Sequence, residues 1–96
     1  MRFMISQPMK GLSKEQIEEN RAYIVKKLTE EGHTIVDSFI EVPDSENKAL
    51  WCLGASFQIM SNCDAVYFLK GWENARGCVL EHKACEAYGV KIYLEE

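Results

Sequence analysis

Glu81 is the residue of this sequence whose type and position most directly suggest chemistry. It lies in the stretch FLKGWENARGCVLEHKACEAYGV (Phe68 to Val90), whose second half predicts a helix from Gly77 to Tyr88. At about 100° per residue, the small and apolar side chains of this helix fill one arc, which also holds Glu81: Gly77, Cys78, Leu80, Ala84, Cys85, Ala87 and Tyr88. A carboxylate buried there without a partner is costly or stays protonated, so its presence requires an explanation.

Glu81 could serve as a nucleophile or as an acid that binds a ribose hydroxyl. Helical side chains lean toward the N-terminus of their helix, so a carboxylate about one turn into the helix would reach the loops at the helix start. The helix N-terminus favours anions by about 0.3–1 kcal/mol, which would help to keep Glu81 ionised. The structural alternative is an acid held by a salt bridge to Arg76 or by a hydrogen bond to a loop amide.

The loop before this helix, GWENARG (residues 71–77), contains further groups suited to a small ligand. Gly71 and Gly77 permit tight backbone turns. Trp72 could stack on a base or a sugar, or it could be a rim aromatic that covers the core. Arg76 could bind a phosphate in a bidentate manner at the helix N-terminus, or it could pair with Glu73 at the surface. The sequence leaves these alternatives open.

Two other features of the sequence could suggest a metal or a cofactor. In each case another part of the required motif is missing. Cys78, His82 and Cys85 have i, i+4, i+7 spacing, but no motif supplies the fourth ligand of a closed zinc site. We therefore expect buried thiols and no metal. Asp37 follows the second predicted strand, where dinucleotide folds hold a ribose-binding acid, but the first turn lacks the G-x-G-x-x-G fingerprint. We expect no nicotinamide and no other cofactor.

Alternating strands and helices must position these residues. Short apolar runs predict strands over 2–6, within 33–42, over 64–69 and over 90–94. Helical spacing predicts helices from Ser13 to about Glu31, over 47–63 and from Gly77 to Tyr88. Ser13 and Gln16 have the spacing of a capping box that starts the first helix, and Gly32 stands where that helix should stop.

This alternation predicts an α/β fold, namely a three-layer flavodoxin- or Rossmann-like sandwich with a short, four- to five-stranded parallel sheet. Residues 1–96 would form a single domain. Ligands of such sheets bind at the carboxyl ends of the strands, so the loops of interest are 7–13, the segment after Asp37, and 70–76. Because so small a sheet leaves apolar helix faces to cover, we expect a homo-oligomer.

Composition narrows the classes of partner. The net charge is −4, with no basic run longer than two residues, which argues against a nucleic-acid polymer. No apolar run approaches the roughly 20 residues of a membrane span, and the opening MRFMIS is too short for a secretory signal. The four cysteines have no C-x-x-C spacing, which is typical of reduced thiols. We expect a cytoplasmic protein without membrane attachment.

Two segments, ISQPMKG and CDAVYFLKGWENARGCVLEHKACEAYGVKIY, resemble the family of unknown function DUF4406, which is related to the nucleoside 2-deoxyribosyltransferases and the deoxynucleoside-monophosphate N-glycosidases. The resemblance spans nearly the whole chain, and GWENARG followed by Leu80-Glu81 is its most specific part. It implies that Glu81 corresponds to the catalytic nucleophile of the transferases. It also implies a nucleoside or nucleotide ligand near the residues that we assign to substrate binding: Ser6, Gln7, Pro8, Met9, Gly71, Trp72, Asn74, Arg76 and Gly77.

The chemistry that this resemblance implies is cleavage of an N-glycosidic bond or deoxyribosyl transfer through a glycosyl-enzyme. The sequence departs from those enzymes at two positions. They hold a second acid where this chain has 54–57 (GASF), and they place Asp or Ser where it has Ala75. Two alternatives therefore stand beside the enzyme: a catalytically silent nucleotide-binding module, and an oligomerisation scaffold with an unused pocket. The enzyme hypothesis predicts that Glu81 faces an open crevice near Gln7, Pro8 and Trp72.

Overall fold

The computed structural model describes residues 1–37 and 43–96. Its elements follow one another in the predicted alternation: β1 (Arg2–Ser6), α1 (Lys14–Glu30), β2 (Thr34–Ile35), α2 (Lys48–Met60), β3 (Ala65–Phe68), a short 3₁₀ helix (Trp72–Asn74), α3 (Arg76–Tyr88) and β4 (Lys91–Leu94). The strands form one sheet in the order β2-β1-β3-β4, and all three pairs are parallel. The predicted α/β fold with a short parallel sheet is confirmed.

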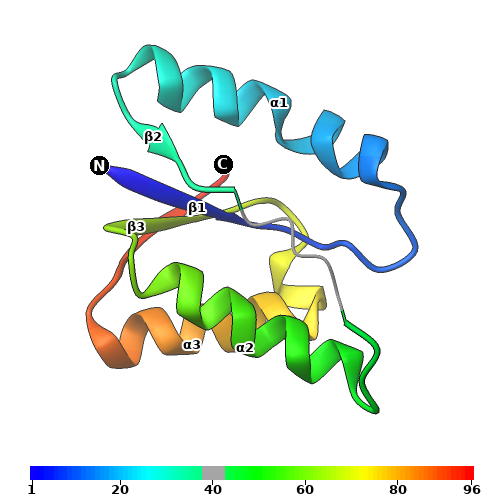
Figure 1. Ribbon diagram of the computed structural model, residues 1–96. Helices are drawn as coiled ribbons and strands as arrows, with labels where there is room; N and C mark the ends of the chain where they lie inside the picture. Colours follow the sequence, from blue (N-terminus) through cyan, green and yellow to red (C-terminus); the bar gives the residue numbers. More distant parts are fainter. Residues whose placement is uncertain (38–42) are drawn as a thin grey trace.

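The sheet lies between two helical layers, with α1 over one face and α2 and α3 over the other (Figure 1). Alternate side chains of β1 point to opposite faces, as the pleat requires. Phe3 and Ile5 pack with Ile24 of α1, whereas Met4 packs with Cys85 of α3. Each face therefore has its own apolar cluster, and the sheet separates the two.

β3 is the most deeply buried strand. All four of its residues are buried, because β1 and β4 flank it and both helical layers cover it. This explains its uninterrupted apolar sequence, AVYF. β4 lies at one edge of the sheet, and its residues are mostly exposed. No helix in the described part of the chain is long and apolar enough to cross a membrane.

The local signals at the ends of α1 are confirmed. Ser13 accepts a hydrogen bond from the Gln16 backbone N–H, and the Gln16 side chain accepts one from the Ser13 N–H, which completes the capping box. Gly32 follows the helix with a φ of 89°, a conformation that glycine adopts without strain. The second strand lies within the predicted range: Thr34–Ile35 pairs with β1, and residues 38–42 of that range lie outside the described residues.

The buried face of α3 differs from the predicted arc. Cys78, Glu81 and Cys85 are buried, but Leu80 is partly exposed and Tyr88 is 86% exposed. The prediction was therefore wrong for one side of the arc. It gave every apolar side chain equal weight, whereas the surrounding elements bury only the face that contains the two thiols. Glu81 lies on that buried face, so the acid is more enclosed than its neighbours in sequence suggest.

Candidate functional site

The candidate site is built where the end of β1 meets the first turns of α3. Ser6, the last residue of β1, follows Met4 on the face that α3 covers. Its hydroxyl lies close enough to Glu81 and Cys78 to lower the pKa of both groups. All three residues are buried, and Glu81 keeps only 9% of its surface exposed. A strand end and a helix start, far apart in sequence, thus place a carboxyl group, a hydroxyl and a thiol together.

Burial dominates the acid–base behaviour of Glu81. Loss of solvent raises the pKa of its carboxyl group to about 7, and the Ser6 hydroxyl opposes this rise. The sequence predicted that the helix N-terminus would help to keep this acid ionised. Desolvation of a carboxylate outweighs a helix-terminus effect of about 0.3–1 kcal/mol, so the group titrates near neutrality instead.

The Ser6 hydroxyl itself is not fully satisfied. Its oxygen is buried, and no partner among the described residues meets the full geometry of a hydrogen bond with it. It therefore lies near the Glu81 carboxyl without completing a well-aligned bond. A buried hydroxyl in this state can turn toward an ionised carboxylate or toward a bound polar group.

Glycines allow the loops of the candidate site to approach one another and Glu81. A Cβ atom on Gly77 would stand 4.0 Å from Glu81 Oε1, so the carboxyl group leans back toward the helix start, as predicted. Gly71 has a φ of 90°, and a Cβ atom there would stand 3.4 Å from Pro8 Cγ. The loops after β1 and β3 are therefore in contact at the carboxyl edge of the sheet.

Gln7 fixes the loop after β1 to helix α1. Its Oε1 atom accepts a hydrogen bond of 2.6 Å from Arg21 Nε, and its Nε2 atom donates one of 3.0 Å to the Ile17 carbonyl oxygen. Both ends of this buried amide are engaged within the protein. Gln7 was predicted to bind substrate, and the structure places its side chain on the α1 side of the sheet, away from Glu81.

Arg21 is a residue that the sequence analysis missed. It is buried on α1 between Ile17, Ile24 and Leu28. Burial lowers the pKa of its guanidinium group, and the charge of Asp37 opposes this effect. A signal was available, because Arg21 occupies an otherwise apolar stripe at helical spacing, and a buried charge in such a stripe requires polar partners.

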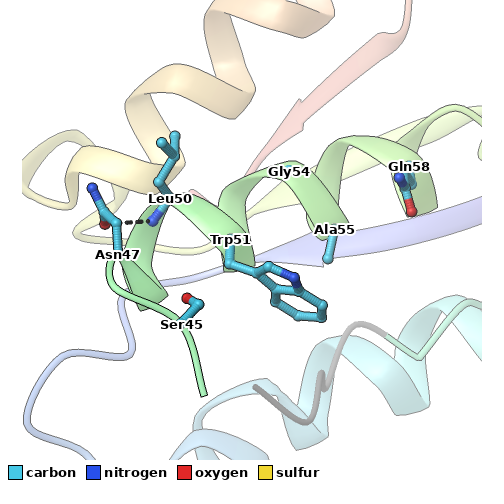
Figure 2. Close-up of a pocket in the computed structure, with 7 residues that line it drawn as sticks. All are labelled: Ser45, Asn47, Leu50, Trp51, Gly54, Ala55 and Gln58. Atoms are coloured by element: carbon cyan, nitrogen blue, oxygen red, sulfur yellow. Dashed lines mark hydrogen bonds between the residues drawn. The ribbon is translucent and has the colours of Figure 1, made fainter. Parts of the chain in front are cut away.

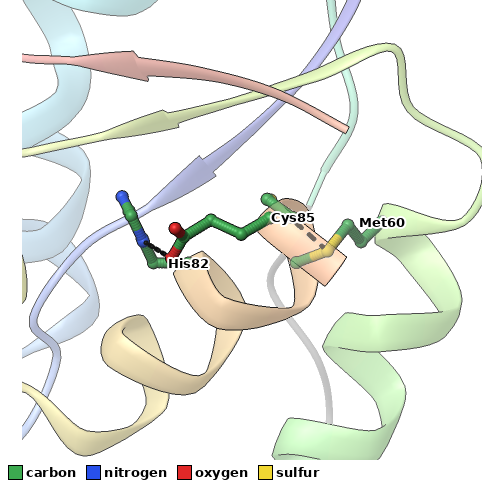
Figure 3. Close-up of polar contacts among 4 residues, drawn as sticks. Met60, His82 and Cys85 are labelled. Carbon is green, nitrogen blue, oxygen red and sulfur yellow. Dashed lines mark hydrogen bonds and ion pairs between the residues drawn. The ribbon is translucent and has the colours of Figure 1, made fainter. Parts of the chain in front are cut away.

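The ring of Trp72 packs against other aromatic side chains of the protein. Its ring stacks on His82 with a centroid distance of 4.4 Å and an interplanar angle of 8°, and it lies 5.4 Å from the Phe68 ring. Figure 3 shows His82 held in place by a polar contact of its Nδ1 atom, 3.0 Å from Glu86 Oε1. The indole therefore packs against His82 and Phe68, and it is only half-buried, so part of its surface is open to a ligand.

The remaining predicted residues lie at the surface. Met9, Asn74 and Arg76 are exposed, and Pro8 is half-buried. Within residues 1–37 and 43–96, no ion pair joins Arg76 to Glu81 or to Glu73. The alternative in which Arg76 neutralises Glu81 is therefore not what the structure shows, and Arg76 presents its guanidinium to solvent beside the start of α3.

A hollow of about 310 Å³ opens at the carboxyl edge of the sheet, lined by residues from the ends of β1, β3 and β4 and from α1: Gln7, Pro8, Leu12, Asn20, Leu69, Lys70 and Glu95. Glu95 Oε1 accepts a 2.7 Å hydrogen bond from the Lys70 backbone N–H, which fixes one wall. Glu81 is not part of its lining. This hollow is therefore not the predicted crevice in which Glu81 faces the Gln7-Pro8 loop.

The thiols of α3 behave as buried apolar groups. Burial raises the pKa of Cys78 and of Cys85 to about 11, and Cys85 Sγ donates to Met60 Sδ at 3.8 Å (Figure 3). The prediction of buried thiols at these positions is confirmed. Among the residues described, no three His, Cys, Asp or Glu side chains are grouped so that they could hold a metal ion.

Comparison with known proteins places the chain in a family. No curated protein matches its sequence. A solved structure of a 2-deoxyribosyltransferase from Bacillus psychrosaccharolyticus shares its fold, with a TM-score of 0.70 over 98% of this chain and 71% of that one, at 16% sequence identity. The family described as "Domain of unknown function (DUF4406)" matches residues 1–94, and the protein belongs to that family.

Proposed function

We propose that this protein cleaves the N-glycosidic bond of a nucleoside or nucleotide, or transfers its deoxyribosyl group, with Glu81 as the nucleophile. The observation that carries this proposal is the Glu81 carboxyl group, which is buried beside the unsatisfied Ser6 hydroxyl at the carboxyl end of β1. Parallel α/β sheets place their ligands at this edge. The shared fold of the 2-deoxyribosyltransferase supports the same reaction class.

The reaction would proceed in two displacements. A Glu81 carboxylate oxygen forms a bond to the anomeric carbon while the carbon–nitrogen bond breaks, and the bonding electron pair leaves with the base, which takes up a proton from solvent. Water or a second base then attacks the anomeric carbon, loses a proton to solvent and releases the Glu81 carboxylate. Attack by water gives hydrolysis, and attack by a base gives transfer.

The ionisation of Glu81 would set the pH range of this reaction. Only the carboxylate form is a nucleophile, and burial holds its pKa at about 7. The free protein would therefore gain activity as the pH rises through neutrality. A hydroxyl that can donate to the carboxylate favours the ionised form, which gives Ser6 a role in tuning the nucleophile.

The substrate that fits these groups is a small molecule rather than a polymer. Arg76 is exposed at the first position of α3, where a backbone N-terminus and a guanidinium could both contact a phosphate. This arrangement favours a nucleoside monophosphate over a nucleoside. The acidic net charge of −4 makes a long nucleic-acid backbone an unfavourable partner.

A second candidate function, a catalytically silent nucleotide-binding module, is favoured by one observation. The base that leaves needs a proton donor, yet within residues 1–37 and 43–96 the pKa of Glu81 responds to burial and to Ser6, and no second carboxyl group of these residues contributes. The segment 54–57 of α2 carries no acid either. Such a module would bind the ligand and leave its glycosidic bond intact.

The test is incubation of the protein with a panel of deoxynucleosides and their monophosphates, followed by chromatography of the free base. The matched variants are Glu81→Gln, which keeps the size of the side chain, and Glu30→Gln, which changes an exposed acid at the end of α1. Base release by wild type and Glu30→Gln, with loss in Glu81→Gln, supports the enzyme. Intact ligands with a ligand-dependent rise in melting temperature support the binding module.

A further inference from the structure

β4 has one open edge. It is the last strand in the order β2-β1-β3-β4, and within residues 1–37 and 43–96 it pairs with β3 alone. Its sequence, KIYL, has three apolar or aromatic residues: Ile92 is partly buried, Tyr93 is 38% exposed and Leu94 is 47% exposed. An exposed, apolar strand edge is a template for pairing with another strand.

The backbone of β4 binds β3 through alternate residues. The N–H groups of Lys91 and Glu95 donate to backbone carbonyl oxygens at the two ends of the ladder with β3, at 3.3 Å and 2.9 Å. Successive residues of a strand direct their N–H and C=O groups to opposite sides. The N–H and C=O groups of Ile92 and Leu94 therefore point away from β3 and line the open edge.

The side chains of β4 complement one another when the strand is paired with a second copy of itself in the antiparallel direction. With Tyr93 on a two-fold axis, Lys91 of one copy lies opposite Glu95 of the other, and Ile92 lies opposite Leu94. The symmetry makes each of these pairs occur twice. Opposite charges and apolar pairs at directly opposed positions stabilise an antiparallel ladder, whereas like charges destabilise it.

The backbone requires the same register. Two opposed residues exchange a pair of hydrogen bonds only when the N–H and C=O groups of both face the other strand. Ile92 and Leu94, the residues with outward backbone groups, are opposite each other in this register. A shift of one residue would place Leu94 opposite Tyr93, whose backbone groups face β3. A shift of two residues would keep the ladder but would separate Lys91 from Glu95, so charge and backbone agree on one register.

We propose that β4 pairs with β4 of a second copy, antiparallel across a two-fold axis at Tyr93, so that the two sheets become one continuous sheet. The Tyr93 ring stacks on Tyr67 at a centroid distance of 6.4 Å, so the two Tyr93 rings would extend an aromatic row across the axis. The sequence led us to expect a homo-oligomer that covers helix faces, and this strand edge is a different surface. The inference is independent of the proposed function, because no residue of β4 belongs to the candidate site.

The charges of this segment favour a copy of the same chain over an unrelated strand. A lysine on an edge strand discourages pairing unless the partner supplies an acid opposite it. A second copy supplies that acid, because Lys91 and Glu95 are equally far from Tyr93 on either side. Glu95 Oε1 accepts a 2.7 Å hydrogen bond from the Lys70 backbone N–H, which holds the carboxylate in place. A carboxylate has further acceptor sites for the lysine of the other copy.

The first test is formation of a disulfide at the two-fold axis. Tyr93→Cys places two thiols opposite each other in a non-hydrogen-bonded pair, whose Cα atoms lie about 4.5 Å apart, within the range that a disulfide spans. Lys91→Cys is the matched control, because four residues would separate each new thiol from its copy, about 13 Å. Mild oxidation should link Tyr93→Cys into a dimer at least about tenfold more than Lys91→Cys or wild type, and peptide mapping should place the link at position 93.

The second test is sedimentation equilibrium over a wide range of protein concentration, with circular dichroism to show that each variant is folded. Wild type should reach twice the chain mass of 11.0 kDa. Lys91→Glu changes an exposed side chain and sets two acids opposite each other twice, so it should raise the dimer dissociation constant at least about fivefold. The double variant Lys91→Glu/Glu95→Lys restores opposite charges and should bind more tightly than Lys91→Glu alone.

Association through another surface would give a different result. Leu50 and Trp51 of α2 border a hollow of about 500 Å³ (Figure 2), and copies that met only there would form no link in Tyr93→Cys and would not respond to Lys91→Glu. That result would overturn the proposal. A wild-type protein that remains monomeric at every concentration would overturn it as well.

Discussion

The Ser6 hydroxyl at the end of β1 lies beside the Glu81 carboxyl group on α3, and it partly offsets the rise in pKa that burial imposes on that carboxyl. The two residues are 75 positions apart in sequence, and only the parallel sheet brings them together. The pair links the fold to the proposed chemistry, because the strand end supplies the polar group that a buried nucleophile needs to ionise.

Replacement of Ser6 by alanine should raise the pKa of Glu81 further. The hydroxyl favours the ionised form, and its removal leaves burial unopposed. Base release as a function of pH would then rise at a more alkaline pH than in wild type. Ser61→Ala, a change of an exposed serine at the end of α2, is the control and should leave the profile in place. An unchanged or more acidic profile in Ser6→Ala would contradict this assignment.

Glu81 should make the protein less stable as the pH rises. Its pKa is about 7 in the folded state and 4.5 without burial, so the folded protein binds the proton more tightly. The stabilisation is complete below pH 4.5 and is lost as the pH rises through about 7, a change of about 3 kcal/mol in the free energy of unfolding.

Glu81→Gln tests this linkage by urea unfolding at pH 5 and pH 8. The variant cannot ionise, so it should lack this part of the pH dependence and exceed wild type in stability at pH 8. Because glutamine also has the amide hydrogens to satisfy, the comparison rests on the slope with pH rather than on one value. Equal slopes in the two proteins would show that the carboxyl is not enclosed as described.

Gly71→Ala should lower the rate of base release as well as the stability of the protein. Gly71 has a φ of 90° and contacts Pro8, whereas Gly32 has a φ of 89° and no neighbour within 4 Å of a Cβ atom. Alanine should cost each position about 1–2 kcal/mol of stability from backbone strain. Only the change at Gly71 should also lower the rate of base release, since relief of strain there moves the Pro8 loop. Equal activity in Gly71→Ala and Gly32→Ala would argue against a functional contact between the two loops.

Trp72→Ala should destabilise the protein by about 2 kcal/mol, as measured by urea unfolding. The indole is partly buried, stacks on His82 and lies tilted against Phe68, so its removal leaves a void beside the α3 layer. Tyr88→Ala removes an aromatic that is almost fully exposed on the same helix layer and should change stability by less than about 0.5 kcal/mol. A loss of similar size in both variants would contradict the packing role of Trp72.

The sequence predicted those parts of the fold that have local causes. The capping box of Ser13 and Gln16 and the stop at Gly32 predicted α1 to within a residue at each end. The apolar run before Leu69 predicted β3, because a strand buried on both faces leaves no position for a polar side chain. The alternation of these elements then predicted the parallel sheet.

Features that depend on tertiary contacts could not be predicted from the sequence in the same way. The orientation of α3 could not follow from its own apolar residues, since Tyr88 is exposed and Glu81 is buried. The bond between Gln7 and Arg21 joins two polar residues that a sequence pattern treats separately. The approach of Ser6 to Glu81 depends on the parallel pairing of β1 with β3 and on the return of α3 over that face.

The most direct test of the proposed nucleophile is the mass of the intact protein after mixing with a reactive deoxynucleotide and quenching in acid. If Glu81 attacks the anomeric carbon, wild type should gain the mass of the sugar group, and peptide mapping should place it on Glu81. Glu81→Gln should gain nothing and release no base. Base release that persists in Glu81→Gln, or a sugar attached to another residue, would contradict the assignment of Glu81 as the nucleophile.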